Sequence, residues 1–211
     1  MLTTRFDDAL VYVSALHRHQ NRKGTAADGV PPIPYVSHLL GVASLVLEAG
    51  GDEDEAIAAL CHDSVEDQAR GGATRREILE RFGERVLEIV MACTKEELSG
   101  ALSDGEKQRR RREVRKHYVD GVRTTTDRSV LRVIAADKLH NARAVLADLQ
   151  ALGDKVWARF NGTPEETLRY YRDVLEALAA AGAEPRLVYE LRRVVTDMEA
   201  LAQSLAAERT R

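Results

Sequence analysis

His62 and Asp63 place an imidazole next to a carboxylate, two side chains that bind divalent metal ions. A chain of this composition contains roughly 0.4 His-Asp pairs by chance, so the pair alone indicates little. Glu66 and Asp67 follow one helical turn later, in the sequence HDSVED after the apolar stretch AIAALC. Four polar groups at the inner end of an apolar helix are costly to bury unless they are paired or bind a metal. The segment therefore predicts a metal-binding or catalytic site.

Two more residues offer ligands of the same kinds. His38 opens the preceding helix, after the sequence PYVS. Asp137 lies within a predicted helix beside the apolar stretch VIAA, where a lone carboxylate is expensive to bury. Together with His62 and Asp63 they form a set of two imidazoles and two carboxylates, which suits Mn, Fe, Zn, Ni or Mg without choosing among them. We therefore predict one divalent metal ion, with open positions for water and substrate oxygens.

The predicted metal site has two further carboxylates close to it in the sequence. A divalent ion lowers the pKa of a bound water and polarises a phosphoryl group. Glu66 and Asp67 lie where a general acid or base can act on that water or on the leaving group. These two carboxylates are therefore the candidate catalytic residues, as proton-transferring groups beside a metal-bound water.

The elements that position these residues are predicted to be helices. Hydrophobic residues make up 44% of the chain and aromatic residues only 5%, a balance that favours helices over strands. No segment shows the alternating pattern of a convincing strand. Helical periodicity bounded by Gly and Pro indicates helices over about residues 4–20, 37–51, 52–67, 74–83, 84–94, 106–117, 129–150, 163–181 and 185–207. The predicted fold class is all-α, a compact multi-helix bundle around the metal site.

Several helix ends carry specific signals. Ser37, Asp52, Thr74 and Thr163 have the side chains preferred at helix N-caps. The last three are each followed three residues later by Glu, which predicts capping boxes. Gly83 is predicted to end the helix that begins near Thr74.

Charge and cysteine content exclude several classes of protein. The chain has 31 Lys and Arg against 34 Asp and Glu, and this balance argues against general nucleic-acid or membrane binding. Cys61 and Cys93 lie in apolar helical segments and predict no disulfide framework. The N-terminal sequence lacks the pattern of a signal peptide, and no apolar run reaches the roughly 20 residues that span a bilayer. We therefore expect a cytoplasmic protein without membrane or nucleic-acid partners.

Two charged or amphipathic segments leave alternatives open. Residues 109–116 read RRRREVRK, and the simplest interpretation is a solvated helix face paired with Glu106 and Glu113. A phosphate-attracting surface or a partner contact are the alternatives. The amphipathic helix over about residues 185–207 makes a homo-oligomer plausible.

The order His, His-Asp, Asp on successive helices resembles the HD-domain phosphohydrolase superfamily. The finer resemblance is to its alarmone-hydrolase branch, which includes the SpoT-type hydrolase domain and the small alarmone hydrolases. Five motifs of that branch occur in order and cover about residues 10–150. They are HRHQNRK at 17–23, PYVSH at 34–38, HDSVED at 62–67, EILERFG at 77–83 and ADKLHN at 136–141. Each motif is weak alone, and the five together are highly specific.

The resemblance implies a domain organisation and a metal centre. It implies one HD-type hydrolase domain over residues 1–211, with a motif core at about 10–150 and C-terminal helices at about 163–207 completing the bundle. His38, His62, Asp63 and Asp137 would bind one metal ion, which is usually manganese in this branch. Glu66 and Asp67 would position and activate the water.

The resemblance also implies substrate-binding residues. Arg22 and Lys23 would face the nucleotide or its phosphates. Asn141, one helical turn after Asp137, would hold ribose or a phosphate oxygen. Tyr170 is the nearest match to a tyrosine that contacts the nucleoside in this family.

The implied reaction removes the 3′-diphosphate from guanosine tetraphosphate or pentaphosphate (ppGpp or pppGpp) and gives GDP or GTP plus pyrophosphate. At 211 residues, no nucleotide-synthesising domain is expected beside the hydrolase. The alternatives are other HD-domain nucleotide phosphatases, acting on NADPH, adenine alarmones or deoxynucleoside monophosphates. A non-catalytic nucleotide-binding module is the alternative from a different class.

The sequence departs from the family pattern outside the predicted metal ligands. The loop between Lys23 and Pro34 is lengthened by AADGVPP. Other departures are Leu39 where Pro is frequent, Ser64 and Gln68 where Thr is frequent, Lys95 where an acid is frequent, and Glu166 where an Arg is expected. These changes concern recognition of the base and phosphates.

Overall fold

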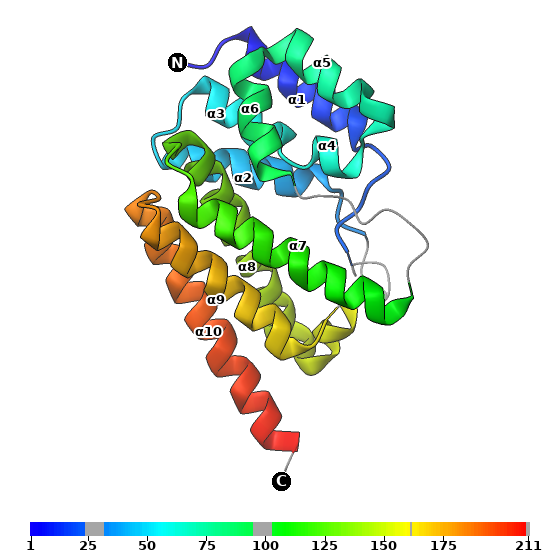
Figure 1. The fold of residues 1–211 in the computed structure, drawn as a ribbon, viewed down its shortest axis with the longest axis vertical. Helices are drawn as coiled ribbons and strands as arrows, with labels where there is room; N and C mark the ends of the chain where they lie inside the picture. Colours follow the sequence, from blue (N-terminus) through cyan, green and yellow to red (C-terminus); the bar gives the residue numbers. More distant parts are fainter. Residues whose placement is uncertain (24–31, 95–102, 161, 210–211) are drawn as a thin grey trace. The chain divides into compact units, whose positions relative to one another are not determined.

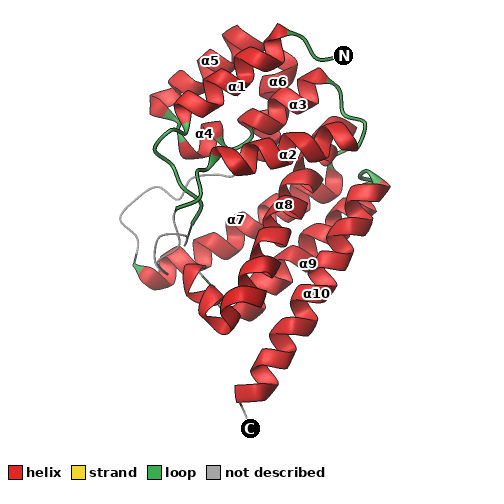
Figure 2. Cartoon of the chain, turned by 180° about the vertical axis from the view of Figure 1, so that it is seen from behind, coloured by secondary structure: helices red, strands yellow, loops and turns green. Residues whose placement is uncertain are grey.

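The computed structural model consists of helices joined by loops and turns, and it describes residues 1–23, 32–94, 103–160 and 162–209 (Figure 1). Figure 2 shows no strand in these ranges, in agreement with the predicted all-α class. The lengthened loop beyond Lys23 lies largely outside them, as does Lys95. The chain divides into two compact units, residues 1–97 with 127–137, and residues 98–126 with 138–211.

The first unit is built around α3. It contains α1 (Thr4–Leu16), α2 (Val36–Glu48), α3 (Glu53–Cys61), α4 (Ser64–Asp67), the 3-10 turn η1 (Arg70–Gly72), α5 (Ala73–Phe82), α6 (Glu84–Cys93) and the first part of α8 (Arg128–Leu152). Helix α3 contacts α1, α2 and α6. Every residue from Glu55 to Cys61 is buried, which is the pattern of a core helix surrounded on all sides.

Glu55 joins α3 to α8 inside the first unit. Only 3% of this residue is exposed. Its carboxylate accepts a hydrogen bond from the backbone N–H of Asp52 at 2.7 Å and forms an ion pair with Arg132 of α8. The Asp52 side chain in turn accepts from the Glu55 N–H at 2.9 Å, which confirms the predicted capping box. The same carboxylate therefore starts α3 and fixes the helix that carries Asp137.

Replacing Glu55 with alanine is expected to destabilise the protein by about 3 to 5 kcal/mol, because it leaves a partly buried guanidinium without its partner. The Nε atom of Arg132 is already buried without a hydrogen-bond partner among the described residues. Urea denaturation followed by circular dichroism measures the loss. Asp120→Ala, which removes the exposed Lys116–Asp120 pair, is the control and should change stability little. Equal losses in the two variants would contradict the prediction.

The second unit contains α7 (Asp104–Thr124), the rest of α8, the 3-10 segment η2 (Gly153–Arg159), α9 (Pro164–Ala180) and α10 (Pro185–Arg209). Helix α9 contacts both α7 and α10. The predicted start of α9 is confirmed, because Thr163 caps it in a capping box with Glu166 and Pro164 occupies its first turn. Glu166 also pairs with Arg112 of α7 at 2.5 Å, so one carboxylate both caps α9 and joins it to α7.

Two predicted helix starts were wrong. The N-cap of α2 is Tyr35 rather than Ser37, and its side chain makes no capping hydrogen bond. The N-cap of α5 is Gly72, whose φ of 87° suits a residue without a side chain. Thr74 lies inside α5 and donates its hydroxyl to the carbonyl of Gln68. Glu77 accepts hydrogen bonds from Tyr12 and Arg70 instead of forming a capping box.

Two predicted helices are shorter than expected. Helix α1 ends at Leu16 instead of continuing to Gln20. The helix predicted over residues 52–67 is interrupted, because α3 ends at Cys61 and α4 begins at Ser64. The interruption falls on His62 and Asp63, the two adjacent residues that the sequence singles out. The predicted end of α5 at Gly83 is confirmed, with φ of 89°.

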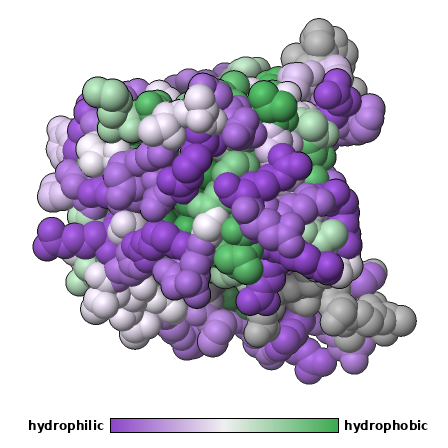
Figure 3. Space-filling model, turned by 90° about the horizontal axis from the view of Figure 1, so that it is seen from above, coloured by the Kyte–Doolittle hydropathy of each residue, from purple (hydrophilic) through white to green (hydrophobic). Residues whose placement is uncertain are grey.

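The surface seen in Figure 3 is mostly hydrophilic, with a smaller hydrophobic area near its centre. In the described part of the chain, no helix combines the length and the apolar character needed to cross a bilayer.

Candidate metal centre

Four side chains meet in the first unit. The Nε2 atoms of His38 and His62 lie 3.3 Å apart, and Oδ1 of Asp137 lies 3.3 and 3.6 Å from them. Oδ2 of Asp63 lies 3.6 and 3.0 Å from the same two nitrogens. Neighbouring ligands of an ion bonded at about 2.1 Å lie about 3.0 to 3.4 Å apart. The spacing of these four donors therefore fits a divalent metal ion.

The cluster is largely closed to solvent. His38, His62 and Asp137 are 0%, 2% and 7% exposed, and their ligand atoms all lie within 4.8 Å of one another. Asp63 is half-buried. Buried imidazoles and carboxylates of this kind require a proton or a cation between them, because burying a lone carboxylate is costly.

The interruption between α3 and α4 explains how adjacent residues reach the same point. His62 ends α3, and Asp63 precedes α4 with φ of −95° and ψ of −3°. These angles depart from those of a regular α-helix, in which successive side chains point about 100° apart. The turn brings Nε2 of His62 within 3.0 Å of Asp63 Oδ2.

Two hydrogen bonds orient the cluster from outside. Nδ1 of His62 lies 2.8 Å from the carbonyl oxygen of Ala59, so this nitrogen donates and Nε2 faces the other ligands. The hydroxyl of Tyr35 donates to Oδ2 of Asp63. Tyr35 stands in the PYVSH motif, but its residue type alone predicts no role at a metal site. Its ring also packs edge-on against the ring of His38, with centroids 5.6 Å apart.

The electrostatics of the cluster favour positive charge. Burial lowers the pKa of His62, but the carboxylates of Asp63 and Asp137 outweigh it and raise that pKa to about 10. Burial raises the pKa of Asp63, but His62 and His38 outweigh it and hold that pKa well below its ordinary value. The carboxylates thus hold a proton on His62, and a divalent cation would take the place of that proton.

The metal-free protein is expected to lose stability as the pH rises from 6.5 towards about 10. The folded-state pKa of His62 lies above its ordinary value of 6.5, so its stabilisation is complete below pH 6.5 and lost through pH 10. Asp63 has a lowered pKa, so its contribution is present above pH 3.8 and lost as the pH falls through the lowered value. Urea denaturation in chelator at a series of pH values measures both limbs. The alkaline limb should disappear in His62→Ala, and an unchanged limb would contradict the assignment.

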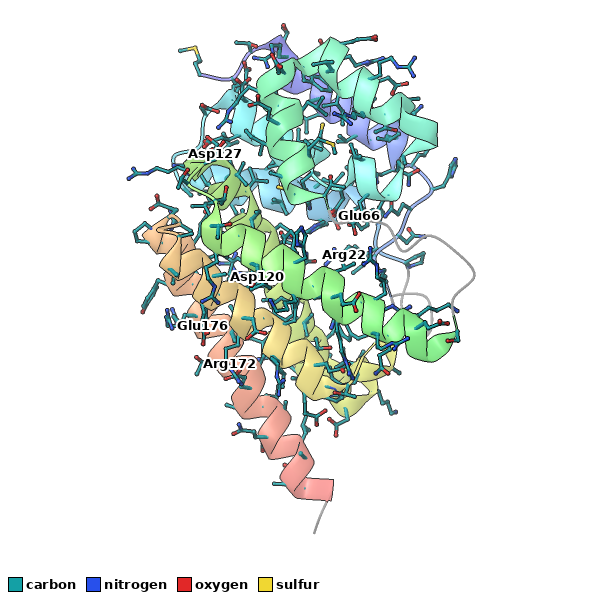
Figure 4. All side chains as sticks on the ribbon, in the orientation of Figure 1. Arg22, Glu66, Asp120, Asp127, Arg172 and Glu176 are labelled. Atoms are coloured by element: carbon teal, nitrogen blue, oxygen red, sulfur yellow. The ribbon has the colours of Figure 1, made fainter. Side chains whose placement is uncertain are left out.

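The two predicted catalytic carboxylates lie on α4, directly after the cluster. The backbone N–H of Asp67 donates to the carbonyl of Asp63 at 2.8 Å, which holds the short helix against the turn. The Asp67 side chain is exposed, and its Oδ2 accepts a hydrogen bond from Nε2 of Gln20 at 2.6 Å. Glu66 is half-buried and is labelled in Figure 4.

The predicted phosphate-binding residues follow α1 in the first unit. The guanidinium of Arg22, labelled in Figure 4, lies 5.8 Å from the ring centroid of Tyr35. The backbone N–H of Arg22 donates to the carbonyl of Ile33 at 2.9 Å, which holds this segment beside the start of α2. The Lys23 side chain is exposed. Arg22 therefore shares Tyr35 with the metal-ligand candidate Asp63.

The other two predicted substrate residues belong to the second unit. Asn141 follows Asp137 by one turn of α8. Tyr170, on α9, lines a groove of about 670 Å³ with side chains of α7 and α9, a volume typical of a small-molecule site. The guanidinium of Arg115 lies 5.3 Å from the Tyr170 ring centroid. The Tyr170 hydroxyl is buried and has no hydrogen-bond partner within the described ranges.

The basic run on α7 takes part in this groove. Positive charge lines the groove from Arg112, Arg115 and Lys116 of the run, from Arg123 later in α7 and from Arg169 of α9. Two of them are neutralised by nearby carboxylates, through the pair of Arg112 with Glu166 and that of Lys116 with Asp120. The predicted pairing of the run with Glu113 is confirmed by Arg110 at 3.5 Å, while Glu106 accepts hydrogen bonds from Ser103 at the start of α7. The run is therefore partly paired and partly directed to a groove.

Comparison with known proteins places these observations in a family. The family model of the HD domain matches residues 9–164. A probable GTP pyrophosphokinase of Mycobacterium leprae is 34% identical over 148 residues, which cover 69% of this chain and 16% of that protein. A guanosine-3′,5′-bis(diphosphate) 3′-pyrophosphohydrolase of Aquifex aeolicus is 40% identical over 84 residues, which cover 40% of this chain and 11% of that protein.

A solved structure has a similar fold. It is a metazoan ortholog of SpoT that hydrolyses ppGpp, with a TM-score of 0.70 and 24% identity, covering 92% of this chain and 95% of that one. The chain spans about a sixth or less of the length of the two curated relatives. The fold is thus shared with a chain of similar extent, and the sequence matches one segment of longer proteins.

Proposed function

Because the chain belongs to the HD-domain family, we propose that it is a metal-dependent phosphohydrolase of nucleotides. The observation that carries the proposal is the buried cluster of His38, His62, Asp63 and Asp137, whose donor atoms have the spacing of ligands around one ion. We propose manganese as the ion, and the donor set also admits iron, zinc, nickel and magnesium. When bound, the ion lowers the pKa of a water molecule and polarises the phosphoryl group.

The surrounding side chains have separate tasks in the proposed reaction. His62, oriented by the Ala59 carbonyl, and Asp63, oriented by the Tyr35 hydroxyl, would hold the ion with their donor atoms already in place. Glu66 and Asp67 take the proton of the attacking water and return one to the leaving oxygen. The water oxygen forms a bond to phosphorus, and the bond from phosphorus to the departing oxygen breaks.

We propose ppGpp or pppGpp as the substrate, with hydrolysis at the 3′ position to GDP or GTP and pyrophosphate. The motif order, the solved relative that hydrolyses ppGpp and the Aquifex pyrophosphohydrolase support this choice. Arg22 and Lys23 would neutralise phosphate charge, and Asn141 would donate to ribose or a phosphate oxygen. Tyr170, which lines the groove of α7 and α9, would contact the nucleoside.

We further propose that residues 1–211 act as one hydrolase domain, since the family match runs through residues of both units. Cytoplasmic action is proposed because Cys61 and Cys93 are buried thiols, as is usual in a reducing compartment. Self-association through α10 remains a prediction that size-exclusion chromatography tests.

The decisive experiment starts from protein stripped with chelator and supplied again with manganese. It is incubated with ppGpp, and the nucleotides are resolved by anion-exchange chromatography, with Asp63→Ala as the inactive control. Manganese-dependent formation of GDP and pyrophosphate, absent from the control, is the expected result. A protein that binds manganese but leaves ppGpp intact would refute the substrate. The same assay would then proceed to NADPH, adenine alarmones and deoxynucleoside monophosphates.

A further inference from the structure

Ser64 and Gln68 each contact one member of a hydrogen-bonded pair of side chains. The pair is His17 and Gln20, which follow the end of α1. Nε2 of His17 lies 3.2 Å from the hydroxyl oxygen of Ser64, and the side-chain amide of Gln68 donates to Gln20 Oε1 at 2.9 Å. Ser64 and Gln68 therefore both contact this pair.

The geometry of the pair fixes its proton positions. Burial lowers the pKa of His17, so its ring is neutral near pH 7. Its Nδ1 lies 2.7 Å from Gln20 Oε1, an acceptor, so Nδ1 donates and Nε2 accepts from the Ser64 hydroxyl. Oε1 of Gln20 thus receives two hydrogen bonds, from His17 and from Gln68. With its oxygen held from two sides, the amide group of Gln20 has only one orientation.

That orientation points the Gln20 amide nitrogen at Asp67. The nitrogen donates to Asp67 Oδ2 at 2.6 Å, across 47 residues of sequence. Asp67 is exposed, and an exposed carboxylate on a helix of four residues samples many rotamers unless a neighbour restrains it. Gln20 supplies that restraint from a segment outside α4.

We propose that Gln20, locked by His17 and Gln68, is the positioning residue that orients the Asp67 carboxylate for proton transfer. The inference rests on the proposed function, in which Asp67 is one of the two proton-transferring groups. Gln20 acts only through Asp67. The role of Gln68 is particular to chains that carry an amide at this position, because the shorter threonine lacks the N–H that contacts Gln20.

The same histidine also supports the metal site by a separate route. The ring of His17 stacks on the ring of Tyr35, with centroids 5.4 Å apart and an interplanar angle of 19°. Tyr35 donates to the ligand candidate Asp63. The two routes are separable, since Gln20 leads to Asp67 and Tyr35 leads to Asp63. Their variants should therefore have different signatures.

The test is a double-mutant cycle of Gln20→Leu and Asp67→Asn. Gln20→Leu is expected to lower kcat by about 10- to 100-fold, the usual cost of losing a supporting hydrogen bond at a catalytic centre, with little change in KM. In the Asp67→Asn background the same change should lower kcat by less than about 2-fold, because the group that it orients is already absent. Independent, additive losses would overturn the proposal.

A second variant separates orientation from packing. Gln20→Glu keeps the size of the side chain but replaces the donor with a carboxylate that repels Asp67. It should lower kcat at least as much as Gln20→Leu, whereas a packing role would leave the activity of Gln20→Glu close to normal. His19→Asn is the matched control on the exposed side of the same segment, and it should stay within about 2-fold of wild type.

Two measurements do not depend on turnover. Calorimetry should find manganese affinity unchanged in Gln20→Leu and about 10-fold weaker in Tyr35→Phe. In ¹⁵N-labelled protein, the Gln20 side-chain amide signal should shift in Asp67→Asn and not in His19→Asn. If the wild type hydrolyses ppGpp and Gln20→Leu keeps the same kcat, the inference about Gln20 is refuted while the proposed function stands. If the wild type does not hydrolyse ppGpp, the proposed substrate fails, while an unshifted amide signal would still refute the Gln20–Asp67 contact.

Discussion

Asp137→Ala is expected to abolish manganese-dependent hydrolysis and to weaken manganese binding by at least about 100-fold. The Asp137 carboxylate lies 3.3 Å from Nε2 of His38 and 3.6 Å from Nε2 of His62, and it is 7% exposed. Loss of one ligand costs more than the 10- to 100-fold typical of an outer partner. Calorimetry of the chelator-stripped protein measures the affinity.

Two companions make this result specific. Asp137→Asn keeps the shape of the side chain, so it should fold like the wild type and still lose most of the affinity with the charge. Asp148→Ala removes another carboxylate from α8, one that is paired with Arg159 at 2.8 Å, and should leave metal binding unchanged. Wild-type affinity in Asp137→Asn would show that this carboxylate is not a ligand.

Glu66→Gln and Asp67→Asn are expected to lower kcat by about 10²- to 10⁴-fold each while the protein still binds manganese. Both side chains follow the metal cluster on α4, and neither belongs to the buried group of His38, His62 and Asp137. Their loss removes proton transfer and leaves the ligands in place. Asp137→Ala differs, because its manganese affinity and its turnover are expected to fall together.

The measurement is steady-state hydrolysis at saturating manganese, beside calorimetry of the same preparations. Asp8→Asn, an exposed carboxylate of α1, is the control for a general effect of lost charge and should have normal turnover. If both α4 variants kept wild-type kcat, the proton-transferring groups would have to lie elsewhere. If both lost the metal, Glu66 and Asp67 would be ligands instead.

The sequence was sufficient to predict which four side chains meet, because His62, Asp63 and Asp137 are costly groups in an apolar context and His38 offers a ligand of the same kind on the preceding helix. These polar groups can be buried only when they face one another or a cation, as for Asp137 beside VIAA and His62-Asp63 after AIAALC. The structure does bring them together. The supporting residues could not be predicted in this way. Tyr35 and Gln20 are ordinary on a helix end or a loop, and their contacts join residues 28 and 47 positions apart.

Capping residues in the sequence predicted a helix start correctly only where their side chains bind backbone N–H groups of the first turn. Asp52 and Thr163 cap their helices as expected, because each satisfies backbone N–H groups at the first turn. Thr74 has the same sequence signature but lies inside α5, where Gln68 and Arg70 use its hydroxyl. The break at His62-Asp63 leaves no trace in the periodicity, because the helical pattern continues through it while the side chains require a turn.

The first unit is discontinuous in sequence, and this has a consequence for the newly made chain. A ribosome that adds about 5 to 20 residues each second needs roughly 5 to 20 s to pass from His38 to Asp137. From residue 63 until residue 137 the nascent protein holds three of the four ligands, and before residue 132 Glu55 has no Arg132 to pair with. An ion that binds only the finished cluster would stabilise complete chains and not interrupted ones. Metal binding would then serve as a check that synthesis has passed residue 137.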